Sequence, residues 1–553
     1  MKKAISMLLL LTIVIGMFAG CVTPGGTTTQ PTVNTGGYET LPTDIKDEHP
    51  GWLCEEKTTL TVYTYAGAND SFPAPSNDLE FWKWLEEYTN VHIEWEVVEV
   101  YGKDYEEILK PKLAVGEGLA DIVMTFNVAN ADSAGKAGVL TDLSLYWDSC
   151  FTKTQAYMNS IGYYDNYVNA LTSSNDAIYS VGGLANPIEG HVVIMYNTAW
   201  MKELGLEIPK TLDEFTAVLQ AMKKAGDLNK NGQDDEVILT SSSMYNNLMG
   251  VLGNAFGLEQ YLAAAPMVLG EDGKVYDEFR TENYKELIRY MADLYKQGIL
   301  DAEITTMNSN TLTQKIANQR VGVMIDWSAQ ALVGELMSGN EGDYGEYYTL
   351  GAPLASKWNN NEGYFVMRNQ APTTPAAVSA SSKNKELACM WLDTLLSDPV
   401  VLQTRTYGFE GKNYKVNDAG EIELIMPEDG SAWNVQELGC GQIALPFIQT
   451  TEQLLASKQQ YPWYLEQYAD LRDNYKWVST SVNTSITLWN DAETQLKTMV
   501  QAPTHKAFRE WRDKVIIGEL DLDASYEEML ANIESLGIDA WVAMWQSIVD
   551  RMK

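Results

Sequence analysis

The chain has 553 residues, and its 75 acidic and 39 basic side chains give a formal net charge of −36. Such a surface excludes nucleic acid and anionic lipid as partners held by charge, because both bind proteins through positive patches. A chain of this length exceeds what a single hydrophobic core usually supports, so we expect at least two lobes.

The first 20 residues predict a signal peptide. Lysines at positions 2 and 3 precede an apolar run, 4–18, that is shorter than the roughly 20 residues needed to span a bilayer. The run leads into Phe-Ala-Gly-Cys at 18–21, which resembles the lipobox of bacterial lipoproteins, where the cysteine is acylated and becomes the new N-terminus. We therefore expect a lipid anchor on Cys21 and an extracytoplasmic location on the bacterial cell membrane. The alternative is an ordinary cleaved signal with an incidental cysteine.

Residues 21–45 are rich in Thr, Pro and Gly. Such a composition buries too little apolar surface to fold, so we predict a flexible linker. No later stretch resembles a membrane span, and the remainder is expected to be a folded body outside the cytoplasm.

Strand and helix patterns alternate at the start of this body. β-Branched and aromatic residues predict a strand at 58–65, and helical spacing of Leu79, Trp82 and Leu85 predicts a helix at 78–88. The same reading predicts the following further elements: a strand at 91–97, a helix at 105–114 and a buried strand at 120–125. This order indicates an α/β fold with a mostly parallel sheet covered by helices.

Ligands of such sheets bind beyond the carboxyl ends of the strands. Tyr65 ends the first predicted strand, and Phe126 and Asn127 follow the third. We take these three residues as candidate ligand contacts, with core packing as the alternative for each.

The segment 227–236 reads Asp-Leu-Asn-Lys-Asn-Gly-Gln-Asp-Asp-Glu and predicts a calcium loop between a helix at 212–225 and a strand at 237–240. Oxygen ligands recur at every second position, and Gly232 lies where a calcium loop must bend sharply. The predicted ligands are Asp227, Asn229, Asn231, the main-chain carbonyl of Gln233, Asp235 and Glu236.

The loop departs from an EF-hand at its twelfth position, where Ile238 replaces the bidentate glutamate. Asp235 and Glu236 supply the missing charge instead. The alternative is a metal-free polar turn, because Asn231-Gly232 is a strong turn dipeptide. Four carboxylates within ten residues would repel one another without a cation, which favours calcium. Because no second loop is paired with it, we expect a structural ion rather than a sensor.

Four cysteines follow Cys21, and they allow three full disulfide pairings that the sequence leaves open. They are Cys54, Cys150, Cys389 and Cys440. Cys389 lies in an amphipathic helix at 385–396 and is expected to be a small core residue. Their spacing does not form a zinc site.

Several segments, taken in their order along the chain, resemble the family 1 extracellular solute-binding proteins of ABC transporters, and the oligosaccharide-binding branch in particular. These segments are 118–124, 176–179 with 195–197, 204–215, 319–327, 382–387 and 536–541. Ala120 stands where the family usually has proline. Several members of this branch carry a loop similar to 227–236, and in them the calcium is structural.

The resemblance implies a two-lobe fold like that of periplasmic binding proteins, with hinge crossings and a ligand cleft between the lobes. The motifs divide the chain into a first lobe at 46–183 and 328–398 and a second at 184–327 and 399–553. The implied function is a monomeric, non-catalytic receptor that captures an oligosaccharide and delivers it to the permease subunits of an importer. Ligand binding would favour the closed form that the permease recognises.

The resemblance also marks ligand contacts in the second lobe. Trp327 matches the family's tryptophan at the crossing, and Trp477 resembles a late helix start that stacks a sugar. Asp326 would either accept hydrogen bonds from sugar hydroxyls or cap the crossing. The composition of 16 Trp and 30 Tyr against 12 Phe favours rings that carry a hydrogen-bonding edge, which suits sugars and also ordinary packing. The acidic total favours a neutral oligosaccharide over a uronide.

Three other classes of protein were weighed. A glycoside hydrolase needs two carboxylates roughly 5–10 Å apart, and with 75 acidic residues such a pair is no evidence. The chain has no metalloprotease, serine hydrolase or phosphate-loop motif, so we expect no enzyme. A peptide-binding lipoprotein of an ABC importer is the nearer alternative, and a structural surface protein is the third.

Overall fold

The computed structural model describes residues 43–66, 73–100, 103–125, 127–184, 192–259, 267–328, 347–367, 372–428, 433–440, 445–448, 461–479, 481–482 and 491–551. The predicted signal peptide, Cys21 and the linker up to residue 42 lie outside these ranges. Across the ranges that are described, no helix has both the length and the hydropathy that a membrane crossing requires.

The first sheet has five strands in the order β2-β1-β3-β12-β4. Its strands are β1 (Thr58–Tyr65), β2 (Val91–Val98), β3 (Ile122–Met124), β4 (Val181–Leu184) and β12 (Pro372–Val378). β1 runs parallel to both β2 and β3, while β12 is antiparallel to β3 and β4. The three strands predicted at 58–65, 91–97 and 120–125 are therefore confirmed, as is their parallel order.

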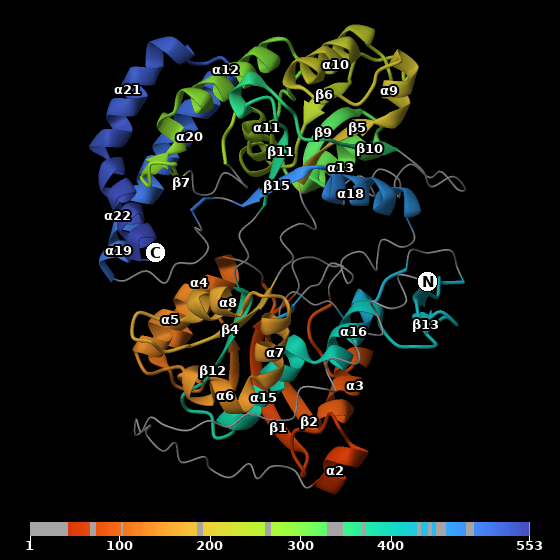
Figure 1. Ribbon diagram of the computed structural model, residues 1–553, viewed down its shortest axis with the longest axis vertical. Helices are drawn as coiled ribbons and strands as arrows, with labels where there is room; N and C mark the ends of the chain where they lie inside the picture. Colours follow the sequence, from red (N-terminus) through yellow and green to blue (C-terminus); the bar gives the residue numbers. More distant parts are fainter. Residues whose placement is uncertain are drawn as a thin grey trace. The chain divides into compact units, whose positions relative to one another are not determined.

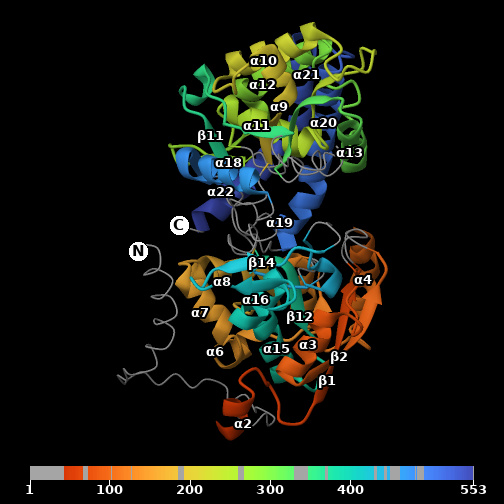
Figure 2. The same cartoon turned by 90° about the vertical axis from the view of Figure 1, so that its right-hand side faces the viewer.

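Helices pack around this sheet, and Figures 1 and 2 show β1, β2 and β12 flanked by α3 and α15. They are α2 (Thr43–Glu48), α3 (Glu80–Thr89), α4 (Lys103–Val115), α5 (Val128–Lys136), α6 (Trp147–Cys150), α7 (Thr152–Ser160), α8 (Tyr164–Leu171), α15 (Lys385–Ser397) and α16 (Pro399–Tyr407). The short hairpin β13 (Tyr414–Val416) and β14 (Ile422–Leu424) follows α16. The helices predicted at 78–88, 105–114 and 385–396 correspond to α3, α4 and α15.

The second sheet has the order β10-β5-β9-β6, with β5 (Val192–Asn197), β6 (Val237–Thr240), β9 (Val321–Trp327) and β10 (Tyr348–Gly351). β9 lies antiparallel to β5 and parallel to β6. Its helices are α9 (Thr198–Leu204), α10 (Leu212–Ala225), α11 (Met249–Ala255), α12 (Glu282–Lys296), α13 (Ser309–Ala317), α18 (Pro462–Asn474), α19 (Asp491–Leu496), α20 (Ala502–Ile516), α21 (Leu522–Ser535) and α22 (Ile538–Arg551). Two further strand pairs join β7 (Met267–Leu269) to β8 (Val275–Asp277) and β11 (Tyr364–Met367) to β15 (Lys476–Ser479).

Local sequence signals set the ends of α10. The Thr211 hydroxyl accepts a hydrogen bond from the Glu214 N–H at 3.2 Å, and the Glu214 carboxylate accepts from the Thr211 N–H at 3.1 Å. This capping box satisfies two donors that a helix start leaves free. The inward face of α10, which includes Phe215 and Leu219, is buried against the second sheet's core.

Strand pairing differs from the predicted division of the chain at two segments. The predicted first lobe includes β10, but this strand forms the edge of the second sheet beside β5. The predicted second lobe also includes residues 399–448, but in the structure α16 packs on α3, and Leu184 of β4 forms a bridge with Ile448. These pairings join segments far apart in the chain, and motif order carries no signal for them.

Several tryptophans and all four described cysteines are buried. Trp82, Trp391 and Trp541 are at most 3% exposed. Cys54, Cys150, Cys389 and Cys440 are all buried and unbonded to one another. The expectation that Cys389 is a core residue is confirmed, because it is fully buried in α15.

Candidate functional site

Trp327 is exposed at the carboxyl end of an otherwise buried strand. Val321 to Asp326 are buried, whereas the Trp327 side chain keeps 37% exposure. β6 runs parallel beside β9, with Thr240 opposite Met324, so the carboxyl ends of both strands lie together. This is the edge of an α/β sheet at which ligands bind.

Residues on both sides of Trp327 are anchored by hydrogen bonds. The Asp326 carboxylate accepts from the Ser242 N–H at 2.6 Å and from the Trp327 N–H at 2.9 Å. On the other side, the Tyr464 hydroxyl donates to the Ser328 hydroxyl at 2.7 Å. The backbone that carries the Trp327 ring is thus held on both sides.

The bonds of Asp326 favour one of its two predicted roles. Its side chain is fully buried, and both carboxylate oxygens accept from groups of the protein itself. Its hydrogen bonds are those of a cap on the turn that follows β9, as the second of the two predicted roles requires. Its partner loop, Ser241 to Ser243, is not among the predicted site residues, although three serines directly after a predicted strand lie where site residues are expected.

Trp477 lies on a strand, so the predicted helix start at this position is wrong. β15 pairs with β11, placing Trp477 opposite Phe365, and the two rings stack with centroids 4.6 Å apart. The indole N–H donates to the Leu471 carbonyl at 3.2 Å. One face of the ring is therefore used in packing, and its role toward a ligand stays a prediction.

The candidates of the first sheet lie at the predicted strand ends but differ in burial. Tyr65 is 1% exposed, with its ring 4.7 Å from that of Tyr105. Asn127 is half-buried and caps α5, because its Oδ1 accepts from the Asn130 N–H at 2.8 Å. Phe126 lies outside the described residues. Of the predicted contacts, Trp327 and Asp326 are joined by a hydrogen bond, whereas Tyr65 is part of a core.

A cavity of about 710 Å³ opens beside α18 and β10 in the second lobe. Its lining includes Trp463, Gln467 and Tyr475, and none of the six predicted ligand contacts. The Gln467 side chain accepts from the Leu350 N–H at 2.8 Å, so it is engaged in covering the edge of β10. Because Trp327 does not line this hollow, we do not assign the ligand to it.

The predicted calcium loop is closed on itself by hydrogen bonds to its own oxygens. The Asp227 carboxylate accepts from the Asn231 N–H at 3.0 Å and from the Gly232 N–H at 2.9 Å. At the other end, Glu236 Oε1 accepts from the N–H groups of Leu228 and Asn229 at 2.7 and 3.2 Å. Gly232 has φ +81°, which is the left-handed conformation that the sharp bend requires.

One buried oxygen of this loop has the chemistry of a calcium ligand. Glu236 Oε2 is buried and has no hydrogen-bond partner, which is the state expected of an oxygen reserved for a cation. Within the described part of the chain, no group of three or more His, Cys, Asp and Glu side chains is gathered as a metal site. The three carboxylates of the predicted set, Asp227, Asp235 and Glu236, are therefore not gathered around one point in this structure.

The chain is similar in sequence to known bacterial solute-binding proteins and lipoproteins. A family model described as bacterial extracellular solute-binding protein matches residues 66–401. The chain is 27% identical over 405 residues to the fructooligosaccharide ABC transporter substrate-binding protein FusA of Streptococcus pneumoniae, covering 70% of this chain and 71% of that protein. It is 24% identical over 481 residues to the lipoprotein LipO of Bacillus subtilis, covering 86% and 87%.

A solved structure of S. pneumoniae FusA with kestose has a TM-score of 0.71 at 21% identity, covering 89% of this chain and 99% of that one. A second FusA structure, of an EF-hand mutant with fructo-nystose, has the same TM-score, identity and coverage. At this identity the likeness concerns the fold, and it confirms the predicted two-lobe α/β architecture.

Proposed function

Because the chain belongs to the bacterial extracellular solute-binding protein family, we propose that it is the capture subunit of an ABC importer and that its ligand is an oligosaccharide. The observation that carries the proposal is Trp327, an exposed ring on an anchored strand end. A flat ring of this kind stacks on the apolar face of a sugar. The relative named as a fructooligosaccharide-binding protein supports the same ligand class.

The proposed mechanism is capture and delivery without a chemical step. The sugar stacks on Trp327, Asp326 holds the turn that presents this ring, and polar groups at the strand ends read the hydroxyls. The two lobes then close, and the closed form is presented to the permease. The protein acts as a monomer, tethered outside the cytoplasm through a lipid on Cys21, and a relative named as a lipoprotein supports that anchor.

Thermal unfolding with a ligand panel tests this proposal. We expect the protein without its signal peptide to be stabilised by one series of neutral oligosaccharides, and not by short peptides. A ligand that binds only the folded state adds about 2.7 kcal/mol to the free energy of unfolding at a hundredfold excess over Kd. Stabilisation by peptides alone would move the protein to the peptide-importer class. Stabilisation by uronides alone would overturn the preference for a neutral sugar.

We further propose that the loop 227–236 binds calcium and that the ion stabilises the second lobe. Its ligands would be the following: Asp227, Asn229, Asn231, the Gln233 carbonyl, Asp235 and Glu236. When bound, the ion supplies charge neutralisation and a rigid link between the end of α10 and the start of β6. A related protein that has been solved as an EF-hand mutant supports a metal loop in this fold.

Replacing Asp227 is expected to remove the stabilisation by calcium. Asp227→Ala deletes the first ligand and the acceptor for two N–H groups. At a hundredfold excess of calcium over Kd, the loss is about 2.7 kcal/mol in the free energy of unfolding, measured by denaturant titration with and without chelator. Asp234→Ala is the matched control, because Asp234 is an exposed acid of the same loop outside the predicted ligand set. Equal responses of both variants to calcium would contradict the assignment.

A further inference from the structure

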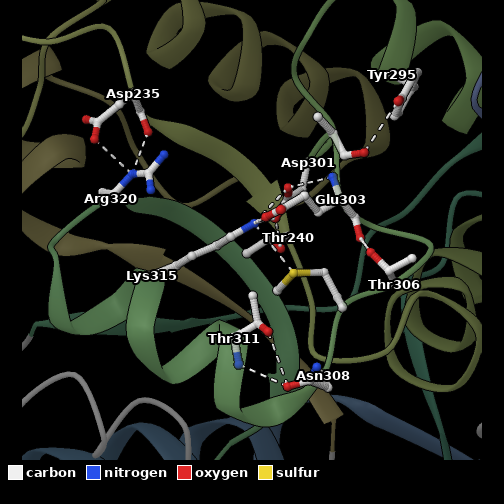
Figure 3. Close-up of polar contacts among 12 residues, drawn as sticks. Asp235, Thr240, Tyr295, Asp301, Glu303, Thr306, Asn308, Thr311, Lys315 and Arg320 are labelled. Atoms are coloured by element: carbon white, nitrogen blue, oxygen red, sulfur yellow. Dashed lines mark hydrogen bonds and ion pairs between the residues drawn. The ribbon is translucent and has the colours of Figure 1, made fainter.

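The two carboxylate oxygens of Asp235 have different partners. Its Oδ1 accepts hydrogen bonds from the side-chain amides of Asn231 and Asn229 at 3.0 and 3.3 Å. Its Oδ2 lies 3.0 Å from Arg320 Nε, which also donates to the Asp235 carbonyl at 2.9 Å. Figure 3 shows the Arg320 side chain directed at Asp235. One oxygen is thus bound by side chains of the loop itself, while the other is held by the guanidinium of Arg320.

Arg320 is itself held by the second sheet. It directly precedes β9, and its carbonyl accepts from the N–H of Val237, the first residue of β6, at 2.8 Å. The guanidinium therefore joins the ninth position of the loop to the two parallel strands. The Asp235 and Arg320 side chains are 26% and 34% exposed, so solvent screens the pair only in part.

Two other basic residues near the loop are engaged elsewhere. Lys230 projects from the loop to Glu203 at 2.8 Å, with both side chains well exposed. Lys315 shares with Arg320 a cavity of about 590 Å³, but its ammonium is bound by Asp301 and Glu303. Among the ion pairs of the described residues, that of Arg320 with Asp235 is the one that involves a predicted calcium ligand.

We propose that Arg320 is a resident counter-cation of the calcium loop, which docks the loop on β6 and β9 before an ion binds and weakens calcium binding by its charge. This inference rests on the proposed calcium role. Crowded carboxylates repel one another, and a guanidinium beside one of them relieves part of that repulsion without any metal. The same positive charge opposes the arrival of a divalent cation.

Removal of Arg320 should therefore act in opposite directions on stability and on affinity. The loop ends stay closed by the Glu236 bonds to Leu228 and Asn229, so the site keeps its shape when the guanidinium is lost. We expect Arg320→Met to lower the Tm by about 2 °C in chelator. We expect the calcium Kd to fall about threefold to tenfold, because one opposing charge a few ångströms away is gone.

The experiment combines calorimetric calcium titration with thermal unfolding of the whole protein without its signal peptide. Arg320→Lys keeps the charge but loses the planar fork, so it should lower the Tm in chelator and leave the calcium Kd near that of the parent. Lys230→Met removes a base of the same loop whose partner is not a predicted ligand, and its Tm in chelator should match the parent.

Two results would overturn the inference. An Arg320→Met variant whose Tm falls equally in chelator and in calcium, with an unchanged calcium Kd, would reduce Arg320 to a packing role. A variant with the parent's Tm in chelator would remove the docking role. If calorimetric titration of the unmodified protein with calcium gives no binding heat, the calcium proposal itself fails. The predicted effect of Arg320 on calcium affinity then fails with it.

Discussion

Trp327→Ala is expected to weaken oligosaccharide binding by one to two orders of magnitude while the free energy of unfolding stays nearly unchanged. The ring is 37% exposed in the protein alone, so its removal leaves no closed cavity. A sugar that covers roughly 100 Å² of this ring at about 25 cal/mol per Å² gains about 2.5 kcal/mol, which is nearly two decades in Kd. Calorimetric titration and denaturant unfolding of the same preparation measure both quantities.

Conservative variants separate stacking from positioning. Trp327→Phe keeps a flat apolar face, so it should retain most of the affinity. Asp326→Asn places an amide against the Ser242 N–H and should weaken binding without touching the sugar. Tyr464→Phe deletes only the hydroxyl that reaches Ser328, and its effect should be smaller. If Trp327→Ala binds the sugar as tightly as the parent, Trp327 does not contact the ligand.

Trp477 is less suited to the same test. Its ring stacks on Phe365 between two paired strands, so Trp477→Ala removes a packing contact whether or not a sugar also touches the ring. A loss of affinity in that variant is informative only if the free energy of unfolding is measured beside it. Trp327 has no such ambiguity because its exposed ring ends the strand.

Local chemistry made part of this fold predictable. The strand at 58–65, the helix at 212–225 and the strand at 237–240 agree in their bounds with β1, α10 and β6. Each is set by signals within a few residues: β-branched side chains, a capping box, or a glycine at a position of positive φ. The bend of the calcium loop at Gly232 belongs to the same class.

Long-range pairing made the rest unpredictable. β10 joins β5 across more than a hundred residues, and Trp477 becomes a strand residue only because β11 lies beside it. Tyr65 ends its strand as predicted, yet whether its ring faces solvent depends on Tyr105 of another element. The position of Trp327 could be read from the sequence, while the burial and bonds of Asp326 required the serine loop after β6 to be located in space.

Lys315→Met is expected to cause the largest loss of stability, about 3–5 kcal/mol in the free energy of unfolding, because it leaves a buried carboxylate without its cation. The Lys315 and Asp301 side chains are 8% and 3% exposed, and their closest atoms are 2.7 Å apart. Figure 3 shows the ammonium between Asp301 and Glu303, with Thr240 of β6 beside them. The Thr240 hydroxyl donates to Asp301 at 2.7 Å, so the pair also fixes the strand next to β9.

An exposed ion pair of the same protein serves as the control for this expectation. Lys476 and Glu362 are as close, at 2.6 Å, but their side chains are 52% and 59% exposed, so Lys476→Met should cost at most about 1 kcal/mol. Adding Asp301→Asn to Lys315→Met removes the stranded charge while keeping an acceptor for Thr240, and should restore much of the stability. If Lys315→Met and Lys476→Met lower the free energy of unfolding by the same amount, the expected stabilisation by the buried pair is contradicted. Because β6 and β9 carry the turn that presents Trp327, the same variant should also weaken sugar binding, and the double variant should recover it.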